Sequence, residues 1–218
     1  LARLILKLLD PDAGEILFRG QDITGLSRAA MQSFRRRMQI IFQDPFGSLN
    51  PRMTVGQSIG EGLRTINMGG REQRQNRVAD LLEMVGIPGW AAQRYPHEFS
   101  GGQRQRIGIA RALSVEPELI ICDEPVSALD VSIQAQILNL LQDLQRRLGL
   151  SYLFIAHDLN VVEYVSDNVA IMYLGHVMEY GPSEVVYSQH LHPYSSALLE
   201  AAPVPEPSAK RSWTPLAG

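Results

Sequence analysis

The chain has 218 residues, of which 45% are hydrophobic, and a formal net charge of −3 at pH 7. This length and apolar content support one large domain, or a main domain with an inserted subdomain. The single cysteine, Cys122, excludes a disulfide framework within the chain. No run approaches about 18 consecutive apolar residues, so the sequence predicts no membrane-spanning helix.

The first forty residues predict two helices and two strands. Apolar residues at positions 1, 4, 5, 8 and 9 form one face of an amphipathic helix over residues 1–9. Residues 15–19 predict a short strand, residues 27–37 a helix with Ser27 as its N-cap, and the apolar run 38–42 a buried strand. The basic cluster at residues 35–37 is more typical of a solvated helix end than of a nucleic-acid surface.

The middle of the chain predicts helices only. Residues from about 54 to 93 contain no strand-like stretch and carry an apolar helix face, so we interpret residues 54–96 as an inserted helical subdomain. Ser100 is the predicted N-cap of a further helix that runs to about Leu113.

In the second half, strands alternate with helices. The predicted strands are residues 119–122, 152–156, 169–174 and 177–180, and the predicted helices are residues 131–148 and 158–165. This alternation predicts an α/β core with a mainly parallel sheet. The proline-rich segment 203–207 predicts an extended, exposed tail.

Two acidic residues, Asp123 and Glu124, follow directly after the apolar run 119–122. Ligands of open α/β sheets bind at the carboxyl ends of the strands, and a carboxylate there can hold Mg²⁺ on a nucleotide. The alternative interpretation is a strand that simply reaches solvent.

The next candidate site contains two adjacent glycines. Ser100, Gly101, Gly102, Gln103 and Arg104 begin the predicted helix, where backbone N–H groups and the helix dipole favour an anion. An ordinary glycine-rich helix start is the alternative. His157 and Gln43 each end a predicted strand, and their alternatives are a surface histidine and a loop amide.

In their order and spacing, these features resemble the ATP-binding-cassette (ABC) ATPases over nearly the whole chain. Residues 99–103 resemble the signature motif, residues 119–124 the Walker B strand with its catalytic glutamate, and residues 127–130 the D-loop. Gln43 and His157 stand where the Q-loop glutamine and the switch histidine stand. Residues 42–52, 95–98 and 192–194 resemble the ATPases of peptide and nickel importers. Such subunits serve the uptake of dipeptides, oligopeptides, nickel or glutathione.

The resemblance implies a P-loop NTPase-like fold and a set of roles. The core would be residues 1–53 and 97–190, the helical signature subdomain residues 54–96, and an importer-type extension residues 191–218. ATP and Mg²⁺ would be the cofactors, with these residues at the site: Glu124 and His157 as catalytic residues, Asp123 and Gln43 at Mg²⁺, Ser100, Gly101, Gly102 and Gln103 at the partner's nucleotide, and Asp130 in the D-loop.

The resemblance also implies partners and a location. A second ABC ATPase subunit would complete the nucleotide sites; it could be an identical copy, but peptide importers often pair two different subunits, which the resemblance favours here. Transmembrane permease subunits would carry the solute, with a solute-binding protein acting indirectly and no nucleic acid involved. The chain would act at the cytoplasmic face of the cell membrane.

The family's first motif, G-x-x-x-x-G-K-[ST], is absent from the sequence, because Lys7 and Lys210 both lack a preceding glycine. In the family this motif leads into a helix like residues 1–9, so we interpret the chain as truncated at its N-terminus. Without the phosphate-binding loop and its lysine, we expect this chain alone not to hydrolyse ATP.

Two other interpretations stay open at this point. A soluble cassette ATPase, of the translation-factor or DNA-maintenance kind, shares the signature, Walker B and switch-histidine motifs. A non-enzymatic binding module that has lost its phosphate loop is the second.

Overall fold

The computed structural model describes residues 1–45 and 47–201, so the predicted proline-rich tail lies outside the described residues. The chain divides into two compact units, residues 1–155 and the segment from residue 156 onward. Each unit is described by itself. The predicted domain boundaries after residues 53, 96 and 190 stay predictions.

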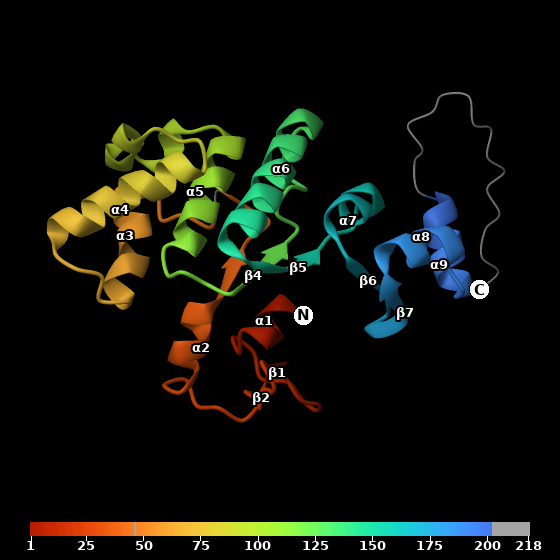
Figure 1. The fold of residues 1–218 in the computed structure, drawn as a ribbon. Helices are drawn as coiled ribbons and strands as arrows, with labels where there is room; N and C mark the ends of the chain where they lie inside the picture. Colours follow the sequence, from red (N-terminus) through yellow and green to blue (C-terminus); the bar gives the residue numbers. More distant parts are fainter. Residues whose placement is uncertain (46, 202–218) are drawn as a thin grey trace. The chain divides into compact units, whose positions relative to one another are not determined.

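A parallel sheet lies at the centre of the first unit (Figure 1). It consists of β3 (Met38–Ile41), β4 (Leu119–Asp123) and β5 (Ser151–Ile155), in the order β3-β4-β5. Both pairs are parallel, which confirms the predicted fold class. Because Ile41 lies beside Cys122 and Asp123 beside Ile155, the three carboxyl ends meet at one edge of the sheet.

Both faces of the sheet are covered. On one face, Ile121 packs with Leu6 of α1 (Ala2–Ile5) and its following turn, and with Phe34 of α2 (Met31–Arg37). On the other, the Tyr152 hydroxyl donates to the Leu141 carbonyl at 2.9 Å, which places α6 (Val131–Leu148) there. Residues of β4 from Ile120 to Cys122 are fully buried, as a continuous apolar run predicts for a parallel strand.

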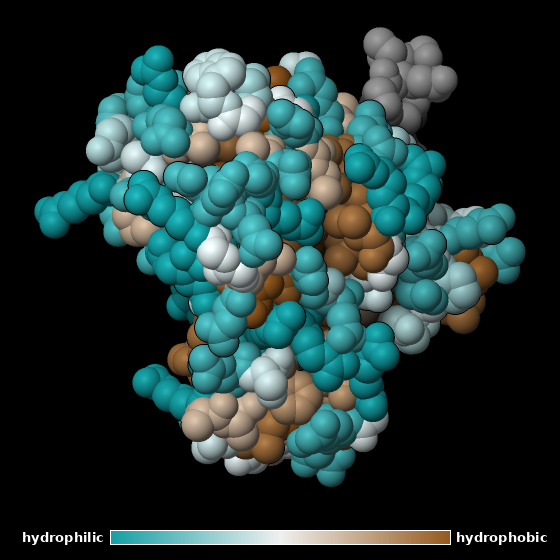
Figure 2. Space-filling view, turned by 60° about the vertical axis from the view of Figure 1, so that its left-hand side comes forward, coloured by the Kyte–Doolittle hydropathy of each residue, from teal (hydrophilic) through white to brown (hydrophobic). Residues whose placement is uncertain are grey.

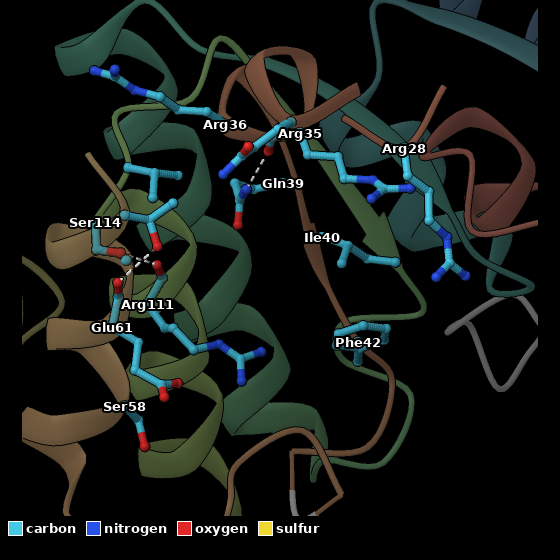
Figure 3. Close-up of a pocket in the computed structure, with 14 residues that line it drawn as sticks. Arg28, Arg35, Arg36, Gln39, Ile40, Phe42, Ser58, Glu61, Arg111 and Ser114 are labelled. Carbon is cyan, nitrogen blue, oxygen red and sulfur yellow. Dashed lines mark hydrogen bonds between the residues drawn. The ribbon is translucent and has the colours of Figure 1, made fainter. Parts of the chain in front are cut away.

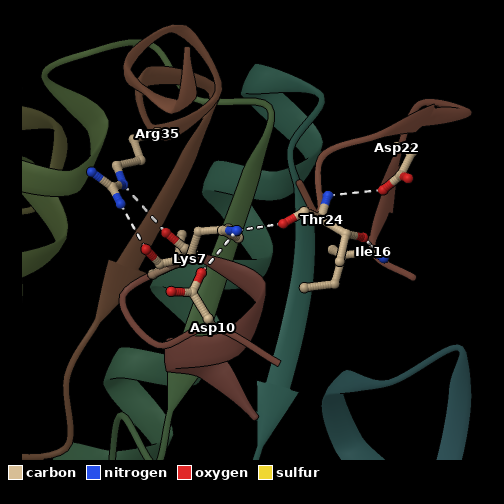
Figure 4. A network of polar contacts seen from close by, with 7 residues as sticks. Lys7, Asp10, Ile16, Asp22, Thr24 and Arg35 are labelled. Carbon is tan, nitrogen blue, oxygen red and sulfur yellow. Dashed lines mark hydrogen bonds and ion pairs between the residues drawn. The ribbon is translucent and has the colours of Figure 1, made fainter. Parts of the chain in front are cut away.

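The predicted helix over residues 1–9 is wrong in its length, since α1 ends at Ile5. Lys7 adopts a left-handed φ of 50°, which turns the chain away and leaves Leu8 and Leu9 exposed. The Lys7 ammonium donates to the Thr24 carbonyl and pairs with Asp10 at 2.9 Å. Arg35 donates to the carbonyls of Leu6 (3.2 Å) and Lys7 (2.7 Å), as Figure 4 shows.

Two further predictions near the N-terminus need correction. The strand over residues 15–19 is a short antiparallel hairpin of β1 (Leu17–Phe18) and β2 (Gln21–Asp22). The second helix, α2, begins only at Met31, and its N-cap is Ala30. Ser27 nevertheless accepts a hydrogen bond from the Ala30 N–H at 3.3 Å, so it stabilises the turn before the helix.

The middle segment is helical, as predicted, but it is divided. It contains α3 (Val55–Thr65), α4 (Arg71–Met84) and two short 3₁₀ helices, η1 (Gly89–Gln93) and η2 (Pro96–Glu98), before α5 (Gly101–Leu113). Helix α3 begins with a capping box between Thr54 and Gln57. The predicted boundaries of α6 are confirmed at both ends, and Gly149 ends it with a φ of 65°.

The second unit begins with α7 (Leu159–Val165), capped by the Asp158 carboxylate, which accepts from the Asn160 N–H at 3.0 Å. Strands β6 (Asn168–Tyr173) and β7 (His176–Pro182) form the predicted hairpin around Gly175. Helices α8 (Ser183–Gln189) and α9 (Pro193–Ala201) follow. Val186 of α8 packs with Val169 and Ile171 of the hairpin.

On the face shown in Figure 2, hydrophilic residues predominate and hydrophobic ones surface in small patches. Among the helices of the described residues, none is both long and apolar enough to cross a membrane.

Candidate functional site

The structure brings two of the predicted site residues together at the carboxyl edge of the sheet. The Gln43 side-chain amide (Nε2) donates to the Glu124 carboxylate (Oε2) at 2.8 Å, across 81 positions of sequence. Gln43 follows β3 and Glu124 follows β4, so the parallel register of the two strands produces the contact. This bond fixes where the carboxylate lies.

The backbone of Glu124 is held in an uncommon conformation. Its φ is 48°, in the left-handed region that residues other than glycine seldom adopt. The Glu124 N–H donates to the Ile155 carbonyl at 2.9 Å, and the Ser127 hydroxyl donates to the Glu124 carbonyl at 3.1 Å. Strained backbone is retained where its surroundings hold it, often at functional sites. The sequence alone did not predict this feature.

Asp123 is the last residue of β4 and is half-buried beside Ile155 of β5. Its carboxylate and the Gln43 amide oxygen suit Mg²⁺, which prefers oxygen ligands. Because Gln43 donates to Glu124 through its nitrogen, its oxygen is the atom left to face a cation or its water. Mg²⁺ usually keeps several waters and takes one or two carboxylates, so this donor set fits the ion.

The signature segment, residues 99–103, forms the start of α5. The Ser100 hydroxyl accepts from the Gln103 N–H at 3.3 Å, and the Gln103 side chain accepts from the Ser100 N–H at 3.0 Å. Buried Arg104 donates to the Pro96 carbonyl at 2.7 Å, in the turn just before the segment. The N-terminus of α5 is therefore held from both sides, with Ser100 and Gln103 exposed.

Two further predicted site residues, Asp130 and His157, lie in other segments of the chain. Asp130 is the exposed N-cap residue of α6 and makes no side-chain capping bond. His157 is an exposed residue of the second unit, directly before the Asp158 cap of α7. Its role at the nucleotide stays a prediction.

A groove in the first unit was not predicted from the sequence. It has a volume of about 590 Å³ and lies between α2 and β3 on one side and α3 and α5 on the other (Figure 3). Arg28, Arg35, Arg36 and Arg111 line it, with Glu61 as the one lining carboxylate. Arg28 lies in the turn before α2, while Arg35 and Arg36 lie in the helix, so no helical spacing in the sequence indicated that they line one groove.

Comparison with models of protein families shows which family the chain belongs to. The family model described as "ABC transporter" matches residues 1–127, more than half of the chain. The chain belongs to the ABC transporter family. The motif resemblance seen in the sequence is thereby confirmed at the level of the family.

The names of individual proteins similar to this chain agree with the family match. A "Putative peptide import ATP-binding protein" of Brucella ovis is 56% identical over 210 residues, which cover 96% of this chain and 66% of that protein. The "Oligopeptide transport ATP-binding protein OppF" of Bacillus subtilis is 54% identical, covering 96% of this chain and 70% of that protein. The chain thus spans about two thirds of the length of these relatives.

A solved structure confirms the fold. The chain is similar to cbiO1 from Clostridium perfringens, described as part of the ABC transporter complex cbiONQ, with a TM-score of 0.76. The two are 31% identical, and the match covers 86% of this chain and 73% of that one.

Proposed function

We propose that this chain is the ATP-hydrolysing motor subunit of an ABC importer, and that the imported solute is a peptide. The observation that carries the proposal is the bond between Gln43 and Glu124 at the carboxyl edge of the parallel sheet. The family match supports the motor role, and the names of the relatives from Brucella and Bacillus support peptides as cargo. Nickel and glutathione are the alternative cargoes that the sequence resemblance raised.

In this proposal each site residue has a defined task. Glu124 takes a proton from the attacking water, a role that contributes about 10²- to 10⁴-fold in rate. Gln43 orients the Glu124 carboxylate through the 2.8 Å bond. Asp123 and the Gln43 oxygen would hold Mg²⁺, which neutralises phosphate charge when bound. His157 would contact the terminal phosphate.

The signature segment would serve a second ATPase subunit. The N-terminus of α5 presents backbone N–H groups and a partial positive charge, and Ser100, Gly101, Gly102 and Gln103 would place them on the partner's nucleotide. Asp130, at the start of α6, would couple the two sites.

The arginine-lined groove would receive the permease. It joins the sheet side of the unit, through α2 and β3, to the helical segment, through α3 and α5. An excess of arginine over carboxylate favours a partner surface that carries Asp or Glu. Through such a contact the chain would be held at the cytoplasmic face of the membrane.

The test uses a graft, because the sequence contains no G-x-x-x-x-G-K-[ST]. A segment that contains G-x-x-x-x-G-K-[ST] is joined to the N-terminus of residues 1–218, and ATP turnover is measured. We expect Glu124→Gln to lower turnover by at least about 100-fold while ATP-dependent dimerisation persists. Glu83→Gln, an exposed change on α4, is the matched control. Equal turnover in the graft and its Glu124→Gln variant would remove Glu124 from the proposed mechanism.

The exposed start of α5 also supports a second candidate function, a non-catalytic partner that completes another subunit's site through residues 99–103. For the 218-residue chain by itself we expect no ATP turnover, because the backbone nest and lysine that hold the β- and γ-phosphates are absent. Stimulation of a full-length partner's ATPase by this chain would support the second candidate. Steady Mg-ATP turnover by the chain alone would contradict the expectation.

A further inference from the structure

The two signature glycines pack against the segment that follows Glu124. A methyl carbon added to the Cα of Gly101 would lie 3.4 Å from Cδ2 of Leu129, which is an ordinary contact. The same addition at Gly102 would lie 2.5 Å from Cγ2 of Ile133, closer than two non-bonded carbon atoms approach each other. Position 102 therefore has no room for a side chain while Ile133 stays in place.

Neither backbone conformation nor helix formation explains glycine at position 102. Gly102 is not among the residues with positive φ, so an L-residue could adopt its backbone angles. It lies inside α5, where glycine is less favourable than alanine. Two physical reasons remain: close approach to the partner's nucleotide, which belongs to the proposed function, and the space that Ile133 already occupies in the chain itself.

Ile133 cannot easily move aside. Its Cγ2 is attached to a branched Cβ, and such side chains have one strongly preferred rotamer in a helix. Helix α6 itself is held in place, since Arg106 of α5 donates to the Gln136 side chain at 3.3 Å. Tyr152 of the sheet donates to the Leu141 carbonyl of the same helix at 2.9 Å.

The same segment is joined to Glu124 by hydrogen bonds. The Ser127 hydroxyl donates to the Glu124 carbonyl at 3.1 Å, and the Leu129 N–H donates to the Val126 carbonyl at 3.1 Å. The Gln134 side chain, in the first turn of α6, donates to the Leu129 carbonyl at 2.9 Å. These bonds hold the segment between Glu124 and Gln134, and Gln134 is the chain neighbour of Ile133.

We infer that Ile133 is a positioning residue for the signature segment. Its Cγ2 methyl sets how closely the first turn of α5 approaches α6, and so sets where the N–H groups of residues 101–103 lie relative to the Glu124 segment. What those N–H groups bind rests on the proposed function, whereas the packing does not.

The first test is a thermal double-mutant cycle on the 218-residue chain. Gly102→Ala should lower the melting temperature by about 2–12 °C, as overpacking does in a domain of this size. Gly108→Ala is the matched control in the same helix, because an added methyl there meets no atom of the described residues within 4 Å. It should raise the melting temperature by about 1–4 °C.

The decisive arm combines the two positions. The Ile133→Ala background removes the Cγ2 methyl. In this background, Gly102→Ala should leave the melting temperature unchanged or raise it. An equal loss in the wild-type and Ile133→Ala backgrounds would overturn the inference, because the two positions would then be independent.

A second readout separates local positioning from a general loss of stability. Amide hydrogen exchange at Gln103 and Arg104 is compared with exchange at Ile109, farther along α5. Ile133→Ala should raise the exchange rate at Gln103 and Arg104, divided by the rate at Ile109, by about tenfold. Ile133→Val, which keeps the Cγ2 methyl, should leave this ratio unchanged. An unchanged ratio in Ile133→Ala would also overturn the inference. Neither readout requires ATP, so a failure of the graft's ATPase would affect the proposed function alone.

Discussion

At the scale of single residues, Ser100 caps a helix with the same atoms that the proposed function assigns to a partner's nucleotide. Its hydroxyl already accepts from the Gln103 N–H at 3.3 Å, and Gln103 returns the bond to the Ser100 N–H at 3.0 Å. This reciprocal pair satisfies two N–H groups at the start of α5 that have no partner within the helix. The signature segment is therefore ordered by the fold before any nucleotide is bound.

Loss of this cap should lower the stability of the fold by a measurable amount. We expect Ser100→Ala to lower the free energy of unfolding by about 0.5–2 kcal/mol, since the N-cap acceptor is lost. Ser100→Gly should cost only about a few tenths of a kcal/mol. Urea unfolding followed by circular dichroism measures both, and an Ala variant as stable as the parent would show that the cap contributes nothing.

Glu118 is a second residue whose charge supports the fold. Its carboxylate accepts from Arg37 at 2.6 Å and pairs with Arg19 at 2.7 Å, and Arg37 also lies over the Phe18 ring. The hydrogen bond from Arg37, with a smaller contribution from the charge of Arg19, holds the pKa of Glu118 below its ordinary value of 4.5.

The lowered pKa predicts the direction of a pH effect. The stabilisation is fully present above pH 4.5, the ordinary value of the group, and is lost as the pH falls through the lower pKa of the folded state. Glu118→Gln should therefore be less stable than the parent at pH 7, and the difference should shrink in acid below pH 4.5. Chemical unfolding across that range measures it, and a difference that does not vary with pH would contradict the prediction.

At the scale of elements, α1 shows how a helix ends when tertiary contacts outweigh an apolar pattern. The pattern continues to Leu9, yet Lys7 turns left-handed and its ammonium lies against the Thr24 carbonyl. Arg35 of α2 then satisfies two carbonyls at the end of α1. Side chains from distant parts of the sequence thus replace the missing helical bonds.

A substitution at Arg35 tests this helix end. Arg35→Met should lower the free energy of unfolding by about 1–3 kcal/mol, because the Leu6 and Lys7 carbonyls lose their charged donor. Arg36→Met, at the exposed neighbour on the same helix, should change it by less than about 0.5 kcal/mol. Equal effects of the two variants in urea unfolding would remove the capping role from Arg35.

At the scale of the whole molecule, the arginine-lined groove is where the helical segment and the sheet side of the first unit meet. A partner that binds there contacts both at once. Such a contact can transmit a change in the distance between them, which a motor subunit requires.

Charge reversal in the groove tests the docking proposal. Arg28→Glu combined with Arg36→Glu should reduce co-purification with the permease subunits by about tenfold or more, since like charges would then face each other. Arg147→Glu, an exposed change on α6 outside the groove, is the control. Retained co-purification in the double variant would place the permease elsewhere.

Much of the fold could be predicted from local patterns. The buried strand before Asp123, the helix over residues 131–148 and the hairpin around Gly175 all agree with the structure. Each has a strong local signal, such as a continuous apolar run, a long helical period or a turn glycine. The predictions for the end of the first helix and the start of α2 were wrong, because these helix ends depend on Lys7, Arg35 and Ala30 rather than on local periodicity.

The sequence by itself determined the order of the motifs, and with it the family, because chemistry-bearing residues follow strands and helix starts at set spacings. Only the tertiary structure decided which of these residues meet. Gln43 and Glu124 are 81 positions apart and lie within 2.8 Å because two parallel strands end at one edge. The left-handed Glu124, the groove of arginines and the contact of Ile133 with Gly102 likewise arise from packing between distant segments. No local pattern encodes such contacts.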